Sequence, residues 1–198
     1  MNFQGILLFF TLAPLLSFGQ FSEKKAYNIE KVQNAPKIDG DLDDNVWSKI
    51  NIANNFSQIS PNNGTTERNH QRTEVKICYD SKNIYFGVMM YDNAPDSILK
   101  ELAIRDNKDA NADHFGIFID PFNNGQIEYE FMISASGVQT DAKITTFSYD
   151  NSWDAVWMSS VKINKEGWVA ELAIPLSQLR FPDNNNSWSM NMARKIRR

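Results

Sequence analysis

Apolar residues recur at every second position in two parts of the stretch 113–141, and this alternation predicts its structure. Residues 115–119 alternate in this way, which indicates a strand with one buried face. Asn124 and Gly125 follow and predict a tight turn, because both residue types tolerate a positive φ. The chain then returns through residues 127–133 with the same alternation. The stretch therefore predicts an antiparallel β-hairpin around which the other strands are arranged.

Comparable patterns along the rest of the chain predict eight further strands, which brings the expected number to about ten. They are expected at 27–32, 56–59, 73–79, 84–91, 138–146, 155–164, 168–174 and 188–196. The segment 84–91 is apolar on both faces, which predicts a central strand covered by other layers. Short helical turns are expected at 97–104, with Ile98 and Leu102 facing inward, and at 175–179. The predicted fold is all-β, an antiparallel β-sandwich with one or two short helical turns.

The segment 36–50 combines several aspartates with apolar residues near its end. Asp43 or Asp44 is suited to cap a short helical turn, because Asp accepts hydrogen bonds from backbone N–H groups. Such a turn would place Trp47 and Ile50 in the core. The same carboxylates could instead ligate a cation, so both interpretations stay open at this point.

Residues 1–19 have the pattern of a secretory signal peptide. An apolar run spans 6–16, too short for the roughly 20 apolar residues that cross a bilayer. It is followed by Ser-Phe-Gly, which places small residues where a signal peptidase cleaves, so we predict cleavage near Gly19. The protein is then expected in the periplasm, the outer membrane or the extracellular space. Residues 20–31 would form a leader and an edge strand, and residues 32–198 one domain.

The composition narrows the functional classes. A formal net charge of -4 and the lack of a basic, aromatic-rich patch argue against nucleic acid as a partner. Lys195, Arg197 and Arg198 are interpreted as the solvated end of a strand. The sequence stops there without a closing turn, which suggests a domain cut from a longer protein. Cys78 is the only cysteine, so it forms no disulfide within the chain and is expected to be a small buried group.

The sequence carries no catalytic motif that we can identify. Its two histidines, His70 and His114, are far apart in the chain and belong to no paired-histidine or Ser/His/Asp pattern. Carboxylates suitable for glycosidase chemistry are present, but they occur on any solvated sheet. We therefore expect binding rather than catalysis in this chain.

The loop that precedes the strand 155–164 has the composition of a sugar-binding site. Sugar rings present apolar C–H faces and a rim of hydroxyl groups, so a site needs an aromatic platform with polar groups around it. Trp153 could provide the platform, and Asp150, Asn151 and Asp154 the polar groups, with Trp157 close behind. The alternative is that both tryptophans are part of the core, where this residue type is highly buried on average.

A second acidic loop, 105–113, has the densest set of oxygen ligands. Asp106, Asp109 and Asp113 alternate there with asparagines, and calcium accepts six to eight oxygen ligands from such flexible loops. The loop lacks the glycine and terminal glutamate of an EF-hand. A calcium site at these three aspartates is therefore one interpretation, and a solvated acidic loop is the other.

Four sequence motifs together resemble a known family. They are PKIDGDLDDNVWSK, NIYFGVMMYD, DHFGIFIDPFNNGQIEYEFMISASGVQTD and GWVAELAIPLSQLRF, and they cover the chain from about residue 32 to its end. In this order they are similar to the family 9 carbohydrate-binding modules, in particular the version at the amino terminus of large exported Bacteroidetes proteins. The resemblance implies a β-sandwich that binds glycans, often with calcium, in secreted polysaccharide-degrading systems.

The sequence departs from the sugar-binding members of that family at their ligand site. Those members clamp the sugar between two tryptophans, one of them just before the strand that corresponds to 115–120. Here the region 109–112 holds no aromatic residue, and Gly116 stands where those members have an acidic residue. The second tryptophan would lie beyond Arg198.

Three functions follow from these observations. The leading expectation is non-catalytic binding of a polysaccharide or oligosaccharide in an exported degradation or uptake system. The alternative is a structural domain that docks on or plugs an outer-membrane β-barrel formed by a carboxyl-terminal region. A weaker alternative is an accessory part of a glycoside hydrolase whose catalytic site lies elsewhere.

Overall fold

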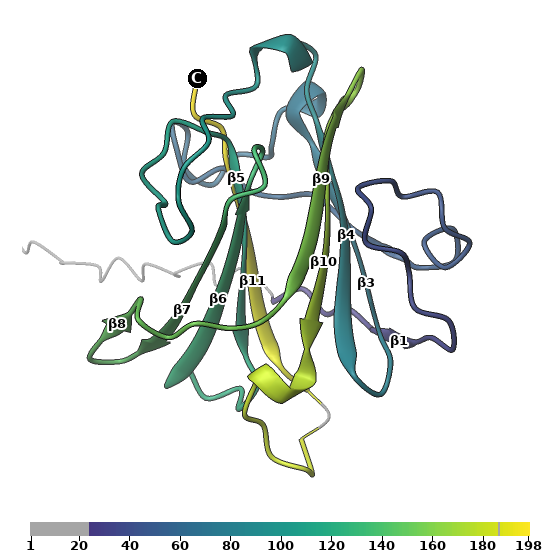
Figure 1. Cartoon of the computed structure of the whole chain (residues 1–198), viewed down its shortest axis with the longest axis vertical. Coiled ribbons are helices and arrows are strands. Elements are labelled where there is room, and N and C mark those ends of the chain that lie inside the picture. The colour runs from purple at the N-terminus through teal and green to yellow at the C-terminus, as the bar shows by residue number, and fades with distance from the viewer. Residues whose placement is uncertain (1–23, 186) are drawn as a thin grey trace, which may run out of the picture.

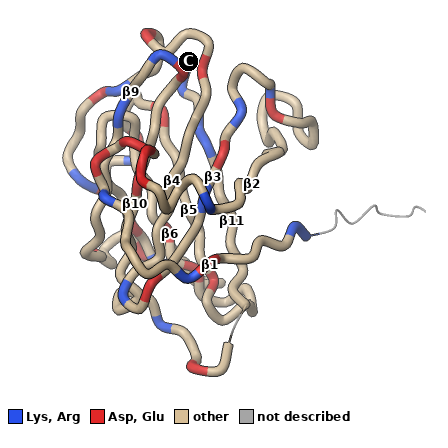
Figure 2. Tube along the Cα trace, turned by 90° about the vertical axis from the view of Figure 1, so that its right-hand side faces the viewer, with Lys and Arg blue, Asp and Glu red and all other residues tan. Residues whose placement is uncertain are grey.

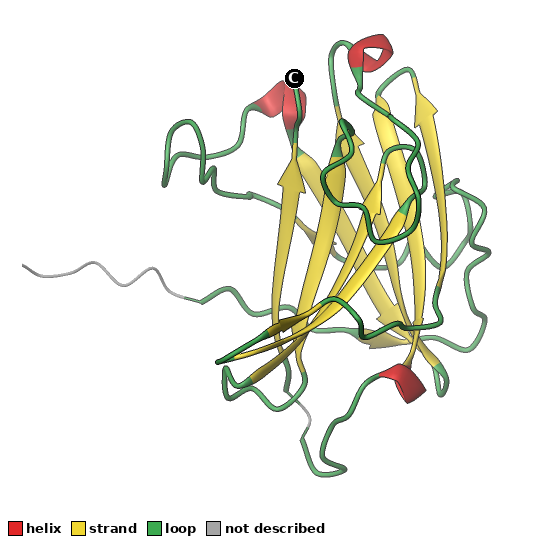
Figure 3. Ribbon diagram, turned by 60° about the vertical axis from the view of Figure 1, so that its left-hand side comes forward, coloured by secondary structure: helices red, strands yellow, loops and turns green. Residues whose placement is uncertain are grey.

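The computed structural model describes residues 24–185 and 187–198, so the predicted signal peptide at 1–19 lies outside the described residues. Two β-sheets pack face to face (Figure 1, Figure 3), which confirms the β-sandwich predicted from the sequence. The described residues form eleven strands, close to the expected ten. No helix in these ranges is long and apolar enough to cross a membrane.

The first sheet, called the β4 sheet here, has the strand order β1-β3-β4-β10-β9, and β2 also pairs with β3. Its strands are β1 (Glu30–Lys31), β2 (Ile52–Ala53), β3 (Thr73–Tyr79), β4 (Asn83–Tyr91), β9 (Met158–Asn164) and β10 (Gly167–Pro175). All these pairings are antiparallel except that of β1 with β3, which is parallel. As its apolar sequence predicts, β4 lies in the middle of the sheet and is buried along most of its length.

The second sheet, called the β5 sheet, is fully antiparallel and has the order β11-β5-β6-β7-β8. Its strands are β5 (His114–Asp120), β6 (Ile127–Ser134), β7 (Gln139–Thr145), β8 (Tyr149–Asp150) and β11 (Ser189–Lys195). The predicted hairpin is β5 and β6. Asp120 closes its turn, because its two carboxylate oxygens accept hydrogen bonds from the N–H groups of residues 122–125 at 2.7–2.9 Å.

The core lies between the two sheets. Each strand turns alternate residues inward, so Phe115, Ile117 and Ile119 of β5 meet residues such as Phe86 of β4 and Leu172 of β10. The residues between them on β5 and β6 face outward. His114, Gly116, Phe118 and their neighbours therefore form the outer surface of the β5 sheet. This surface contains the candidate site described below.

Two local predictions were wrong. The expected helical turn at 97–104 is an extended segment, and Leu102 is 78% exposed. The reason is a competing backbone pairing: the Asp113 N–H donates to the Leu99 carbonyl at 2.8 Å, and Lys100 pairs with Ala112. The 3₁₀ turns of the described residues are Asn69–Gln71, Pro95–Ser97 and Leu176–Gln178, the last at an expected position. The expected strand 56–59 is reduced to a single bridge between Ser57 and Thr66.

The acidic segment 36–50 covers the outer face of the β4 sheet. Trp47 and Ile50 are buried as predicted, in a second apolar cluster with Tyr85 and Ala173. The segment forms successive turns rather than a helix, and Asp44 accepts a hydrogen bond from the Lys37 N–H at 2.7 Å. The expected cap of a helical turn by Asp43 or Asp44 is therefore absent, and the Asp44 carboxylate instead fixes the start of the segment through Lys37. Figure 2 shows acidic and basic residues along the chain.

One buried carboxylate on β10 attaches this segment to the sheet. Glu171 is fully buried, and its Oε2 accepts hydrogen bonds from the N–H groups of Asp39 at 2.9 Å and Gly40 at 2.8 Å. Its Oε1 accepts from the Trp47 indole N–H at 2.8 Å. Burial raises the pKa of Glu171, while these hydrogen bonds act in the opposite direction.

Candidate functional site

Two surface depressions lie on the outer faces of the two sheets. One, of about 260 Å³, lies on the β5 sheet over β5, β6 and β11. The other, of about 450 Å³, lies on the β4 sheet beside the segment 36–50. The depression on the β5 sheet is the better candidate, because it combines an apolar floor with a buried polar atom that lacks a partner.

The floor of this depression is apolar and comes from three neighbouring strands. Gly116 of β5 lies opposite Met132 of β6 on one side and Ala193 of β11 on the other. Phe118 follows two residues later on the same face and is half-buried. The Phe118 ring and the Met132 methyl group lean over Gly116, where an added Cβ would lie 3.3 and 3.6 Å from them, so these two side chains form the apolar floor.

The rim is polar. Lys108 and Asp109 reach it from the loop before β5, and His114 and Lys195 from the ends of β5 and β11. His114 and Lys195 lie directly opposite each other in the strand register. Arg194 also lines the depression, but its guanidinium group donates to the carbonyl oxygens of Gln71 and Tyr91 on the inner side.

His114 is 4% exposed, and its Nδ1 is buried with no hydrogen-bond partner among the described residues. Leaving such a group unsatisfied costs about 1–3 kcal/mol. Burial lowers the pKa of His114, the charges of Lys195 and Arg197 lower it further, and the Ala112 backbone carbonyl opposes them. The imidazole is therefore held neutral at physiological pH, where it can donate or accept a hydrogen bond.

A second polar group borders the depression. The Lys108 ammonium lies over the Tyr149 ring, 3.9 Å from its centroid, and the Tyr149 hydroxyl donates to Glu130 at 2.6 Å. Burial raises the pKa of Tyr149, and the hydrogen bond to Glu130 raises it further. This chain of contacts links the loop before β5 to β8 and holds Lys108 beside the sheet.

The predicted tryptophan platform lies elsewhere. Trp153 packs on the inward-facing residues Tyr129 and Phe131, with ring centroids 5.1 and 5.8 Å apart. Trp157 is buried against Phe131, and its indole N–H donates to Asp141 at 2.8 Å. Trp157 belongs to the core between the sheets, and Trp153 packs against it. Core packing was the alternative to a sugar platform for these two residues.

The polar residues of the same loop form local contacts. Asp150 accepts hydrogen bonds from the N–H and hydroxyl groups of Ser152, and these bonds lower its pKa. Asp154 pairs with Arg105 at 3.2 Å, and Asn151 is exposed in the turn. Asp150 and Asp154 thus border Tyr149 and Arg105, but they do not line the depression.

The three aspartates proposed for calcium are held in different ways. Asp113 is buried, and its Oδ1 accepts a hydrogen bond from the Arg197 N–H at 2.9 Å. Asp106 lies beside Arg105 and accepts from the Asp141 N–H at 3.3 Å, whereas Asp109 is exposed on the rim. Within residues 24–185 and 187–198, no group of three or more Asp, Glu, His or Cys side chains is placed to hold a metal ion.

The sequence profile of the family described as "Carbohydrate family 9 binding domain-like" matches residues 38–195. The chain belongs to this family. The match covers every strand of the two sheets except β1, and most of the segment 36–50. No curated protein matches the chain.

Two solved structures of family 9 carbohydrate-binding modules are similar to this chain. Both come from Caldicellulosiruptor kristjanssonii and are 18% identical to it. The complex with glucose has a TM-score of 0.57 and covers 85% of this chain and 76% of the module. The complex with cellotriose has a TM-score of 0.56, with 83% and 75% covered. At this identity the likeness shows a shared fold.

The floor and most of the rim of the depression were not predicted from the sequence. One signal was present: Phe118 is a large apolar residue at an outward position of an alternating strand. An apolar side chain at an outward position indicates a binding surface when it is part of a contiguous exposed patch. Lys195 and Ala193 carried no such signal, since only the pairing of β11 with β5 brings them to the same place.

Proposed function

We propose that this chain is a non-catalytic carbohydrate-binding module that holds a saccharide in the depression on the outer face of the β5 sheet. The observation that carries the proposal is the combination, in a family 9 domain, of an apolar floor with a polar rim. Related modules that bind glucose and cellotriose support the same class of ligand.

The residues of the depression suit a sugar. The half-buried Phe118 and the side chain of Met132 can contact the apolar C–H face of a ring. Asp109 and Lys195 can exchange hydrogen bonds with hydroxyl groups at its edge. Such contacts are reversible, so binding needs no covalent step.

The proposal includes where in the cell the domain binds its saccharide. Residues 1–19 have the pattern of a signal peptide, so we propose that the domain acts in an exported polysaccharide-degradation or uptake system. The departure at 109–112 bears on the ligand. Where sugar-binding relatives have a clamping tryptophan, Lys108 and Asp109 form the rim, so we propose that polar contacts replace one aromatic contact here.

The test is a calorimetric screen of the purified chain against glucose, cello-oligosaccharides and a wider set of glycans, with calcium and with chelator. Binding should weaken about tenfold or more in Phe118→Ala, because the apolar platform is lost. Phe147→Ala removes an aromatic side chain that is 97% exposed and serves as the control.

Two results would redirect or end the proposal. Binding that survives Phe118→Ala but is lost in folded Trp153→Ala would move the site to the loop 149–154. A folded chain that binds no saccharide would contradict the function itself. Comparing the titrations with calcium and with chelator decides separately whether saccharide binding needs calcium.

A further inference from the structure

The charges around one end of the depression are mostly positive. Lys195 is exposed, and it forms no ion pair with any described residue. It lies across from His114 in the register of β11 and β5. Asp109 is the only carboxylate among the residues that line the depression. The rim therefore carries more positive than negative charge.

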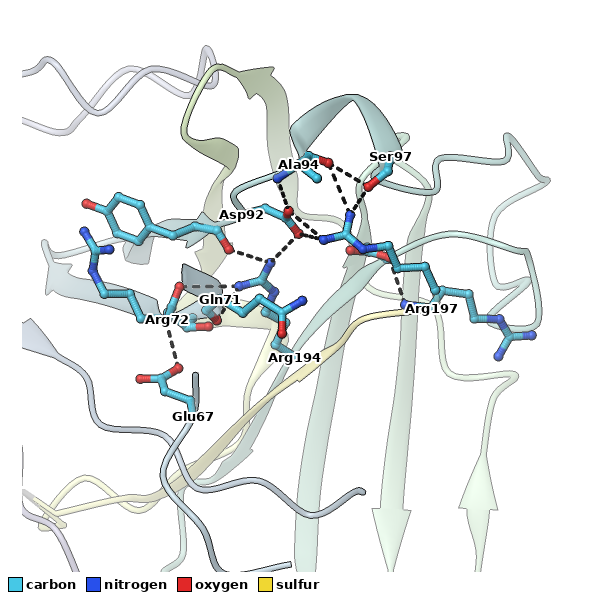
Figure 4. A network of polar contacts seen from close by, with 12 residues as sticks. Glu67, Gln71, Arg72, Asp92, Ala94, Ser97, Arg194 and Arg197 are labelled. Atoms are coloured by element: carbon cyan, nitrogen blue, oxygen red, sulfur yellow. Dashed lines mark hydrogen bonds and ion pairs between the residues drawn. The ribbon is translucent and has the colours of Figure 1, made fainter. Parts of the chain in front are cut away.

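Arg197 adds to this charge. Its backbone N–H donates to Asp113, which holds the residue beside the start of β5. Its side chain extends away from the network around Asp92 (Figure 4) and is exposed. Burial is the main cause of the lowered pKa of His114, and the charges of Lys195 and Arg197, which lie near the imidazole, lower it further.

Other carboxylates near this end have polar partners but keep their charge. Glu130, opposite Phe118 in the register, accepts the hydrogen bond of Tyr149, and Asp92 is bound by two arginines. Asp113 accepts a hydrogen bond from the Arg197 N–H through Oδ1, and its Oδ2 has no partner among the described residues. The depression on the β4 sheet has the opposite character, since four carboxylates and one lysine line it. The two faces of the sandwich thus differ in the sign of charge that they offer to a ligand.

We propose that the His114–Lys195–Arg197 end of the depression binds an oxyanion substituent of a sugar ring, a carboxylate or a sulfate ester. The saccharide that the domain recognises is then an acidic one. The Lys195 ammonium supplies a charge-assisted hydrogen bond to this group, and the exposed Arg197 adds positive charge beside it. The inference rests on the proposed function and names its ligand class.

The experiment compares matched sugars on the purified chain at low salt. Glucose is titrated beside glucuronate and glucose 6-sulfate, and galactose beside galacturonate and galactose 6-sulfate. We expect an anionic sugar to bind at least about tenfold more tightly than its neutral parent. This preference should shrink as salt rises, because the contacts lie at the surface.

A pair of lysine variants locates the effect. Lys195→Gln should remove the preference for the anionic sugar and weaken binding of the neutral parent much less, because glutamine can still exchange a hydrogen bond with a hydroxyl group. Lys165→Gln changes an equally exposed lysine in the turn between β9 and β10, and should leave the preference intact. Both lysines are exposed, so both variants are expected to fold.

The outcomes separate this inference from the proposed function. Equal affinity for neutral and anionic partners would overturn the inference and leave sugar binding intact. Inorganic sulfate or acetate that binds as tightly as the sugar would also overturn it, since the site would then be an anion site. If Lys195→Gln kept the preference for the anionic sugar, the oxyanion would not bind at Lys195, and the proposed position of the site would be wrong. A chain that binds none of the sugars would contradict both proposals.

Discussion

Asp92 and Arg198 form an ion pair through both carboxylate oxygens, at 2.6 and 2.7 Å, although 106 positions separate them in the chain. The Asp92 side chain is fully buried, and it also lies 3.9 Å from the Arg194 guanidinium (Figure 4). The Ala94 N–H donates to the same carboxylate at 2.8 Å. Arg198, expected to be solvated, is instead bound at the end of the sandwich.

Asp92→Asn should lower the free energy of unfolding by about 3 kcal/mol, because two arginines would lose a buried counter-charge. Urea denaturation of both proteins measures the difference. Asp96→Asn, at an exposed position of the same turn, should cost less than about 0.5 kcal/mol. Equal losses in the two variants would show that the pair does not stabilise the fold.

Gly87→Ala should destabilise the chain by about 1–3 kcal/mol, because the added Cβ has no room. It would lie 2.8 Å from Cδ2 of Leu42 and 3.0 Å from the Trp47 indole, beneath the segment 36–50. Gly116→Ala is the matched control on the other sheet. There the Cβ would lie 3.3 Å from the Phe118 ring, and we expect a loss below about 1 kcal/mol. A larger loss in Gly116→Ala would contradict this packing.

Trp153→Ala should act mainly on stability. Its ring packs on Tyr129 and Phe131, so its removal leaves a cavity that costs about 2–4 kcal/mol. Phe147→Ala, by contrast, should change the free energy of unfolding by less than about 0.5 kcal/mol. Thermal unfolding of the two variants tests this, and an unchanged midpoint for Trp153→Ala would mean that the ring is not part of the core.

Asp141 predicts a pH dependence of stability. Burial raises its pKa above 3.8, although hydrogen bonds from Trp157, Ala155 and Arg105 oppose the shift. Between 3.8 and the raised value, the folded state binds more protons than the unfolded chain. The contribution of this group to the free energy of unfolding therefore falls as the pH rises, by at most about 1.4 kcal/mol per pH unit.

Asp141→Asn removes this titration. The free energy of unfolding of the wild-type chain minus that of the variant should decrease from pH 4 upward and become constant above the raised pKa. Denaturant titrations at a series of pH values measure it. A difference that increases with pH would mean that Arg105 lowers the pKa of Asp141 more than burial raises it.

The alternation of apolar residues determined the longer strands and which face of each is buried, whereas the two-residue strands β2 and β8 were not predicted. It placed β5 and β6, the central β4, and the buried Trp47 and Ile50 correctly, because these features depend on residues close together in the chain. The same local pattern failed at Leu102, where pairing with the distant residues 111–113 replaced the expected helical turn.

The candidate site was decided by tertiary structure. The loop around Trp153 has the local composition of a sugar platform, but in the folded chain the Trp153 ring packs against Tyr129 and Phe131 of β6. Lys195 and His114 are unremarkable in sequence and meet only because β11 adds to the edge of β5 in one register. A period of two specifies the face on which a side chain lies, whereas long-range strand pairing decides which side chains share that face.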